Sequence, residues 1–446
     1  MTANLLPENP TQMEEFQEVE MSSSFAELVK ENVRCVNTTE SLSPQLKLRL
    51  KSIDVSISCK QFLKWRNTKR DFQSPDSYLT KKQWFWLYGL ASCRTPSDCT
   101  GRNGGRGKLV QRHADEFPSS RRVKRKEYRM LNRKERNQFH AALNAMKSDS
   151  IDHLSKYDIF VSIYKSWRSP GAKFGPSFLP WHREFLRMFE LALRQYDIDL
   201  AIPYWDSRLD YSLPDPRASI MWSEEFMGNM GQQVKQGPFA FWTPIGTTGK
   251  RTGLNRWNKI EGSGTLLRQA DLDYMKTLNS YDKLTFCVNP YFEMISDSVR
   301  TWVGGHLSDL SKAPNDPVFF LHHCMIDYLW EWWRTTHQNP SQRIHDYPNF
   351  QKSCNEHHLL YNPMLPFLKS NADGLSNLYT QEFYQYQPSP TCSLRHRSCH
   401  SRYLFCDTRV SRCVSKVVAG GACKGFERFD VCYRSKCVNG ICRGEL

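Results

Sequence analysis

The chain lacks any apolar run that approaches the roughly eighteen residues of a membrane-spanning helix. Its first residues also lack the basic start and apolar core of a signal peptide. No nucleic-acid-binding motif is present. The formal charge of +15 would suit an acidic partner, but the basic residues are mostly scattered along the chain. These absences argue against a membrane span and against a nucleic-acid-binding protein.

One concentrated basic segment interrupts this scatter. Such runs are most often solvated, so we expect a loop before a helix. Residues 122–125 also match a weak proteolytic processing pattern. The basic residues of the segment are Arg121, Arg122, Lys124, Arg125 and Lys126.

The composition predicts one large domain with appendages. At 446 residues, with 39% apolar and 13% aromatic residues, the chain can bury a substantial core. Thirteen Trp, nineteen Tyr and twenty-five Phe favour an interior filled with aromatic rings.

Fifteen cysteines are many for this length, and eight of them fall within the last fifty-five residues. Such a density is useful for disulfides only in an oxidising compartment. We therefore expect an extracellular, secreted protein, although no signal peptide is visible. A glycosylation sequon at Asn37-Thr38-Thr39 agrees with a secreted glycoprotein.

The chain divides into four predicted segments. Residues 1–34 are polar and acidic, which indicates disorder or a pro-segment, and residues 35–126 hold four cysteines that could form two disulfides. Residues 127–388 form the main domain, and residues 389–446 form a cysteine-rich module. The eight tail cysteines allow 105 pairings, so the connectivity stays open. Zinc is the competing interpretation of the tail, but the tail has no paired Cys-x-x-Cys.

Apolar residues at helical spacing predict a mainly α main domain. Asn132 and Glu135 form a capping-box pattern before the first helix. About ninety residues rich in Pro, Gly and Trp separate the third and fourth helices. We expect an antiparallel four-helix bundle core with long loops. The later helices are expected near 157–167, 178–196, 291–302 and 317–334.

Two segments are unusually specific: 178–190, Phe-Leu-Pro-Trp-His-Arg-Glu-Phe-Leu-Arg-Met-Phe-Glu, and 316–327, Asp-Pro-Val-Phe-Phe-Leu-His-His-Cys-Met-Ile-Asp. Each places a histidine, His182 or His323, on the apolar stripe of a helix. Trp-Val-Gly-Gly-His at 302–306 shortly precedes the second segment. Together they resemble the tyrosinases and, more widely, the type-3 copper proteins. The tail is similar to the extension of invertebrate, mollusc-like members, so the likeness runs from about residue 55 to the C-terminus.

The resemblance implies two copper ions, each held by three histidine imidazoles, which bind dioxygen between them and oxidise phenols to quinones. His182 matches the third ligand of the first copper and His323 the third ligand of the second. His322 and Asp327 match positions expected to support these ligands by hydrogen bonds.

The other four ligand positions carry no histidine in this chain. At the first copper, Tyr164 and Lys173 occupy the positions of the first and second ligands, and Lys173 lies nine residues before His182. Ser296 and Arg300 replace the pair that the family places at i and i+4 before Trp-Val-Gly-Gly. Rescue by His140 or His153 is disfavoured, because a ligand also needs the right direction. No cysteine lies between Cys99 and Cys287, so the Cys–His thioether of some relatives is absent.

This pattern leaves three possibilities open. The favoured one is a degenerate enzyme that persists as an extracellular scaffold or binding protein, with a phenolic small molecule or a matrix protein as partner. The alternative is an active copper-dependent phenol oxidase, and the third is a decayed or wrongly assembled gene product. In the favoured case Lys173 and Arg300 must find partners, because unpaired buried cations are costly. Asp297 and Asp327 are the candidates.

Overall fold

The computed structural model describes residues 61, 78–92, 122–231, 233–245, 253–257, 264–287, 291–348 and 354–444. The predicted segment 1–34, the sequon at Asn37 and the four N-terminal cysteines lie outside these residues. Among the residues described, no helix combines the length and apolarity that crossing a bilayer requires.

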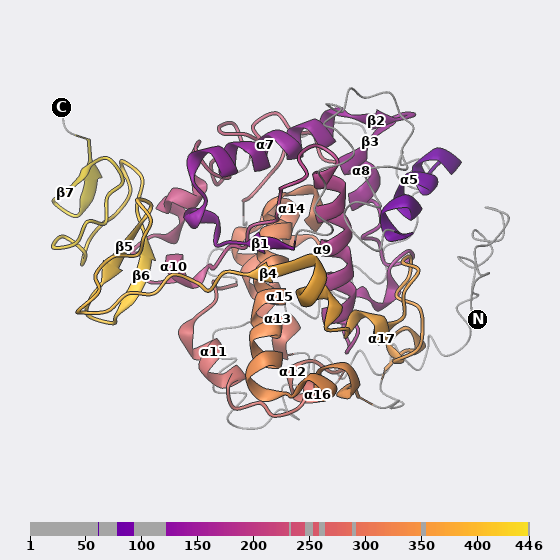
Figure 1. Ribbon diagram of the computed structural model, residues 1–446. Coiled ribbons are helices and arrows are strands. Elements are labelled where there is room, and N and C mark those ends of the chain that lie inside the picture. Colours follow the sequence, from indigo (N-terminus) through magenta and orange to yellow (C-terminus); the bar gives the residue numbers. More distant parts are fainter. Residues whose placement is uncertain are drawn as a thin grey trace, which may run out of the picture.

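Helices dominate the main domain (Figure 1). The first is α7, Arg133–Ser148, which begins as predicted. The Asn132 side chain accepts from the Glu135 N–H, and the Glu135 carboxylate accepts from the Asn132 N–H. This capping box satisfies two N–H groups that the first turn leaves without helical partners.

The long helices around the domain centre are α9, Phe178–Arg194, α13, Tyr291–Val303, and α15, Val318–His337. Their bounds agree with the predicted helices within a few residues. Helix α9 packs against α7 and α15, and α13 also packs against α15. Residues 291–303 and 318–337 therefore lie side by side in the interior, although a loop separates them in sequence.

The predicted length of the second helix is wrong. It was expected over 157–167, whereas α8 spans only Lys156–Val161. After it, the Ile163 N–H bonds to the Phe160 carbonyl, three residues back, and the Ser162 hydroxyl donates to the Ile159 carbonyl. The chain thus tightens and leaves the helix, because a serine hydroxyl competes for the carbonyl that the next turn would use.

The basic segment is also not the solvated loop that was expected. Val123–Arg125 is strand β1, which pairs in parallel with β4, Tyr384–Tyr386. Arg125 is fully buried: its Nε donates to Glu190 at 2.9 Å, and its guanidinium lies 3.5 Å from the centroid of the Tyr384 ring. Alternation along a strand explains the result, since Lys124 points to solvent while its neighbours point inward.

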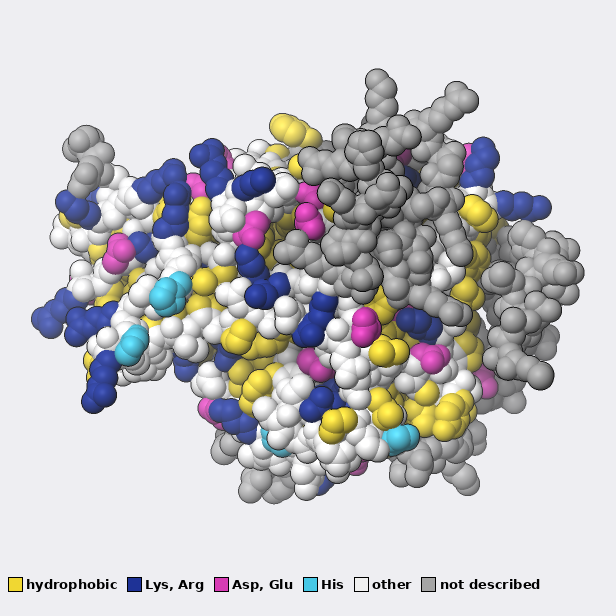
Figure 2. All heavy atoms as spheres, in the orientation of Figure 1, with side chains coloured by type: hydrophobic (Ala, Val, Ile, Leu, Met, Phe, Trp, Pro, Cys, Tyr) yellow, Lys and Arg dark blue, Asp and Glu magenta, His cyan; other side chains and the backbone are white. Residues whose placement is uncertain are grey.

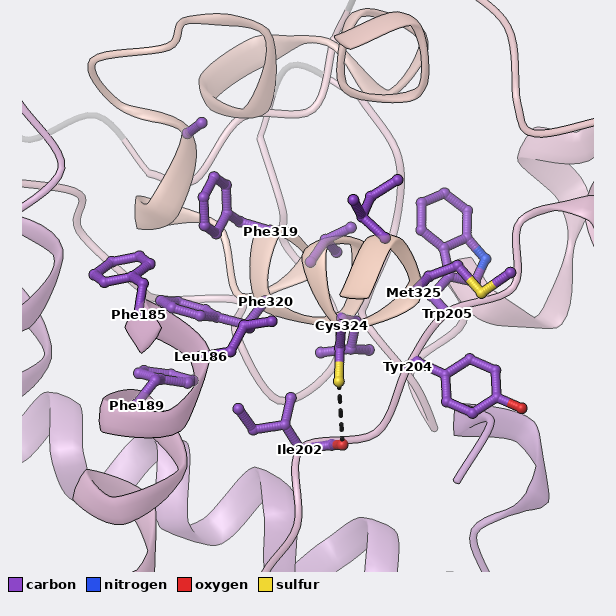
Figure 3. Close-up of a cluster of buried hydrophobic side chains, with 14 of the residues drawn as sticks. Phe185, Leu186, Phe189, Ile202, Tyr204, Trp205, Phe319, Phe320, Cys324 and Met325 are labelled. Atoms are coloured by element: carbon purple, nitrogen blue, oxygen red, sulfur yellow. Dashed lines mark hydrogen bonds between the residues drawn. The ribbon is translucent and has the colours of Figure 1, made fainter. Parts of the chain in front are cut away.

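A close-packed aromatic cluster joins α9 to α15 (Figure 3). The Phe189 and Phe320 rings stack with centroids 3.5 Å apart, and Phe185 lies 5.8 Å from Phe320. Full burial of one such side chain contributes roughly 1.5–3 kcal/mol relative to exposure. The cluster therefore fixes the two helices that carry His182 and His323.

The remaining elements are short and pack around this centre, as the composition between α9 and α13 predicted. Tyr379–Phe383 is a π-helix, and Ser150–Ile151 pairs with Leu154–Ser155 in an antiparallel hairpin, β2 and β3. The short helices are α10, Arg208–Tyr211, α11, Gln269–Met275, α12, Tyr281–Leu284, α14, Gly305–Ser308, α16, Pro340–His345, and α17, Asn371–Gly374, and the 3-10 turns are Tyr128–Met130, Pro170–Ala172, Pro216–Ala218, Ile220–Trp222, Ala313–Asn315 and Glu356–His358.

Of the aromatic N-terminal region, helix α5, Lys81–Ser92, is described. Trp86 packs into the main body and donates to the Gln195 side chain at 3.2 Å. Phe85 does not, because its side chain is 73% exposed. One face of α5 therefore packs against the main body and the other is exposed.

The C-terminal module consists of two antiparallel hairpins, β5, Leu404–Asp407, with β6, Arg412–Ser415, and β7, Lys436–Val438, with β8, Ile441–Arg443. All eight tail cysteines form disulfides, so none is left as a thiolate for zinc. A small apolar cluster forms around Phe405, Phe426 and Phe429. The pairs are Cys392–Cys406, Cys399–Cys413, Cys423–Cys437 and Cys432–Cys442.

The module docks on the main domain. The Ile220 N–H donates to Lys416 O at 2.8 Å and the Val418 N–H to Ala218 O at 2.9 Å. Leu213 of the main domain shares the apolar cluster of the module. The module is therefore in direct contact with the main domain.

Non-reducing peptide mapping is expected to find no free thiol among the eight tail cysteines and to recover the four disulfide-linked pairs. Cys324 is the internal control. It is a buried free cysteine and should react with an alkylating agent only after unfolding. Free thiols throughout residues 392–442 would contradict the module and the oxidising compartment that it implies.

Candidate metal centre

Six positions from separate elements meet in the buried centre of the main domain. Helix α9 supplies His182, α15 supplies His323, and α13 supplies Ser296 and Arg300. Tyr164 comes from the turn after α8, and Lys173 follows the 3-10 turn Pro170–Ala172. None of the six side chains is more than 2% exposed.

The two histidines stack on each other. Their ring centroids lie 4.1 Å apart with an interplanar angle of 5°. The His182 Nδ1–H donates to the Phe178 carbonyl at 2.8 Å, which leaves Nε2 as the acceptor for the Tyr164 hydroxyl at 3.3 Å. Burial first, and then the charge of Lys173, lower the pKa of His182 well below its ordinary value. The ring is therefore a neutral imidazole with both nitrogens engaged.

His323 is held by ring contacts only. Neither of its nitrogens has a hydrogen-bond partner among the described residues. The Phe319 ring lies 4.2 Å from the imidazole centroid and the Phe178 ring 6.1 Å. Burial, followed by the neighbouring His182, lowers the pKa of His323 well below its ordinary value. This ring is neutral as well.

Lys173 is locked into the centre by two carboxylates. Its Nζ lies 2.9 Å from Glu293 Oε1 and 2.9 Å from Asp297 Oδ1. Burial alone would lower the pKa of Lys173, but the charges of Asp297 and Glu293 together raise it. The ammonium therefore stays charged and also lies 4.9 Å from the centroid of the Phe178 ring.

Arg300 completes the network. It shares Asp297 with Lys173 through a short ion pair and donates to the Leu307 carbonyl at 3.2 Å. Burial would raise the pKa of Asp297, but Arg300 and Lys173 lower it overall. For Glu293 burial prevails and raises the pKa, although Lys173 opposes it. Two cations and two acidic groups thus face one another in the interior.

Ser296 pairs with a histidine that the resemblance does not make a ligand. Its Oγ lies 2.9 Å from His322 Nε2, and the same nitrogen lies 3.1 Å from the Ser296 carbonyl oxygen. Burial lowers the pKa of His322 to about 3. His322 therefore bridges α15 to α13 as a neutral ring.

Asp327 is not a partner of Lys173 or Arg300, contrary to expectation, and it does not touch the paired histidines. Its Oδ1 accepts from Arg183 Nε at 2.7 Å, and its Oδ2 accepts from the Tyr384 hydroxyl at 2.7 Å. The reason is position along α15. Asp327 lies four residues after His323, on the same side of the helix but about 6 Å further along its axis, where Arg183 and Tyr384 contact it.

Other histidines do not replace the missing donors. His140 lies against the Tyr128 hydroxyl, 2.5 Å from its Nε2, and His153 is exposed. His358 is buried, with Nδ1 2.5 Å from Ser177 Oγ. No group of three histidine or acidic side chains within metal-binding reach was found among the described residues. The groups that were found consist of tail cysteines already in disulfides.

Glu293 is the member of the network that sequence reasoning missed. A signal was present, because Glu293, Asp297 and Arg300 are spaced i, i+4 and i+7 on one helix. Such spacing places three side chains on the same face. Because Lys173 stands at a ligand position close to that face, both Glu293 and Asp297 could have been predicted as its partners.

The residues present do not fit two copper ions. Copper in proteins favours neutral nitrogen or soft sulfur donors. Of the six ligand positions, two carry imidazoles, which stack in parallel, and two carry cations where the resemblance places further donors. The neighbouring His322 has its Nε2 bonded to Ser296. Seating metal cations there would require Lys173 and Arg300 to leave buried ion pairs.

The fold is mainly helical, and its long helices α9, α13 and α15 converge on a buried centre that contains His182 and His323. Residues 154–336 match the family model described as the common central domain of tyrosinase. The chain is 37% identical over 338 residues to tyrosinase-like protein tyr-3 of Caenorhabditis elegans, covering 72% of this chain and 47% of that protein. It thus spans about half the length of that relative.

For two further relatives, the aligned region makes up a larger share of the relative's length. A tyrosinase-like protein of Pinctada maxima is 30% identical over 318 residues, which is 66% of this chain and 67% of that protein. A tyrosinase of Streptomyces antibioticus is 34% identical over 240 residues, covering 48% and 83% respectively. This chain belongs to the tyrosinase family.

Proposed function

We propose that this chain is a catalytically degenerate tyrosinase-like protein that acts as an extracellular scaffold or binding protein. The observation that carries the proposal is the buried network of Lys173, Glu293, Asp297 and Arg300. It fills the centre with fixed charges and hydrogen bonds where copper-binding members of the family need neutral donors.

The energetic argument concerns what copper would have to displace. Removing one partner from a buried ion pair typically costs about 3–5 kcal/mol, because it leaves the other charge uncompensated. Two ions entering this centre would separate Lys173 and Arg300 from their carboxylates and add positive charge beside them. The ion pairs also tie the loop at Lys173 to α13, so they take over a cross-linking role for the helices.

The retained framework supports a scaffold. We propose that α8, α9, α13 and α15 correspond to the four-helix core of the family, held by the aromatic cluster between α9 and α15. The disulfides of the module support an extracellular location. A scaffold needs this stability and a surface for partners, but no reactive metal.

The test is copper content together with catechol oxidation on the purified full-length chain. We expect well under one copper per chain after incubation with excess copper and dialysis, and catechol oxidation at the rate of the buffer. A copper-loaded bacterial tyrosinase is the positive control. Two coppers per chain with turnover of catechol would overturn the proposal and establish the alternative, an active phenol oxidase.

A further inference from the structure

The C-terminal module carries a strong net positive charge. Residues 391–444 contain eleven Lys and Arg against three Asp and Glu. They therefore contribute more than half of the net charge of +15, although they make up a small part of the chain. Figure 2 shows Lys and Arg side chains gathered on the lobe that Figure 1 places at the left.

Most of this charge is exposed. Nine of the eleven cations are exposed, whereas Asp407 is buried and only Glu427 and Asp430 are exposed acids. Of the nine, seven are arginines. The exposed cations are Arg395, Arg397, Arg402, Arg409, Lys424, Arg428, Arg434, Lys436 and Arg443.

Several of these arginines are held in place before any partner arrives. The Arg409 guanidinium lies 4.6 Å from the Phe426 ring centroid and 4.8 Å from that of Phe429. Arg402 and Arg434 lie 5.8 Å and 4.9 Å from the centroid of the same Tyr433 ring. The disulfides fix the loops that carry them. Arg409 also pairs with Asp407 and Arg434 with Glu225, and each guanidinium has further N–H groups for an anion. Because these side chains are already ordered, little conformational entropy is lost when an anion binds, which favours affinity.

We propose that this module binds a sulfated polysaccharide through its cationic surface. Arginine is suited to sulfate groups, because its planar fork donates two parallel hydrogen bonds to neighbouring oxygens. A linear polyanion can contact cations spread over two hairpins, which a small anion cannot. The inference deepens the proposed function by naming the class of partner that the scaffold would bind.

The disulfides favour an extracellular polyanion as the partner of the module. Eight cysteines paired in four bridges belong to an oxidising compartment, where nucleic acids and the anionic lipids of the cytoplasmic leaflet are not the ordinary partners. Sulfated polysaccharides are extracellular polyanions with the required charge density. Duplex DNA and phosphatidylserine vesicles are therefore comparison ligands in the test.

The experiment measures binding of the full-length chain to immobilised heparin as a function of NaCl concentration. We expect affinity to fall linearly with salt on a double-logarithmic plot, as for other linear polyanions. The variant Arg395→Ser/Arg397→Ser/Arg428→Ser/Arg443→Ser should bind about tenfold or more weakly at 150 mM NaCl and show a shallower slope. None of these four arginines forms an ion pair within the described residues, so the fold should persist.

The matched control removes the same charge from the main domain, as Lys81→Ser/Arg133→Ser/Lys134→Ser/Lys283→Ser, all at exposed positions. Its heparin affinity should change by less than about twofold. An equal loss in both variants would overturn the proposal, because it would show attraction by net charge alone. Undiminished binding to desulfated heparin, or tighter binding to DNA or to the vesicles, would overturn it as well.

These outcomes are independent of the copper test. A chain without copper that fails to bind heparin overturns the partner and leaves the degenerate centre standing. A chain with two coppers that binds heparin through the module overturns the degenerate centre and leaves the partner standing. Thermal unfolding of each variant, together with the absence of free thiols in the tail, verifies that the substituted module is folded.

Discussion

The variant Tyr164→His/Lys173→His/Ser296→His/Arg300→His is expected to bind close to two copper ions per chain, where the parent binds almost none. The four positions already converge on one centre with His182 and His323, so the substitutions supply three imidazoles to each metal. They also remove both cations. Glu293 and Asp297 then lack partners, and the metal ions would supply the compensating positive charge.

Copper stoichiometry after dialysis and the thermal unfolding midpoint are the two measurements. Without metal the variant should unfold at a lower temperature than the parent, and copper should raise its midpoint, since a ligand that binds only the folded state stabilises it. Each single substitution should fail, because one new imidazole cannot complete either set of three donors.

The matched control replaces the same four residues by alanine. It removes the same cations and hydrogen bonds without adding donors, so copper should not raise its unfolding midpoint. A quadruple histidine variant that stays free of copper while remaining folded would show that these positions are not the ligand positions of the family.

The helices that carry the centre could be predicted from local patterns. The apolar stripes of α9 and α15, like the capping box that begins the neighbouring helix α7, are properties of short sequence segments. The end of α8 was not predictable in the same way. A tightened turn and the Ser162 hydroxyl bond end that helix early, although its apolar spacing continues to Trp167.

The partners inside the centre were only partly predictable. Asp297, one of the two candidates, is a partner; it lies three residues before Arg300 on the same helix, a spacing that the sequence shows directly. Asp327 was the wrong candidate, because its neighbours Arg183 and Tyr384 come from other elements. The burial of Arg125 has the same cause: only the pairing of β1 with β4 makes an inward-facing cation there possible.

The buried network also makes a prediction about stability. Asp297 Oδ1 accepts from both Lys173 and Arg300, so Asp297→Asn removes the charge that the two cations share. We expect the free energy of unfolding to fall by about 3–5 kcal/mol, the usual cost of leaving a buried charge without its partner. Urea unfolding followed by tryptophan fluorescence measures the change.

The matched control is Asp273→Asn on α11. Asp273 also pairs with a cation, Lys276, at 2.8 Å, but both side chains of that pair are 51% exposed. Exposed pairs contribute about 0–1 kcal/mol, so this variant should unfold almost like the parent. If the two substitutions cost the same, the centre is solvated and its ion pairs do not hold the helices. A much larger cost at Asp297 would show that fixed charges stabilise the position where family members bind metal.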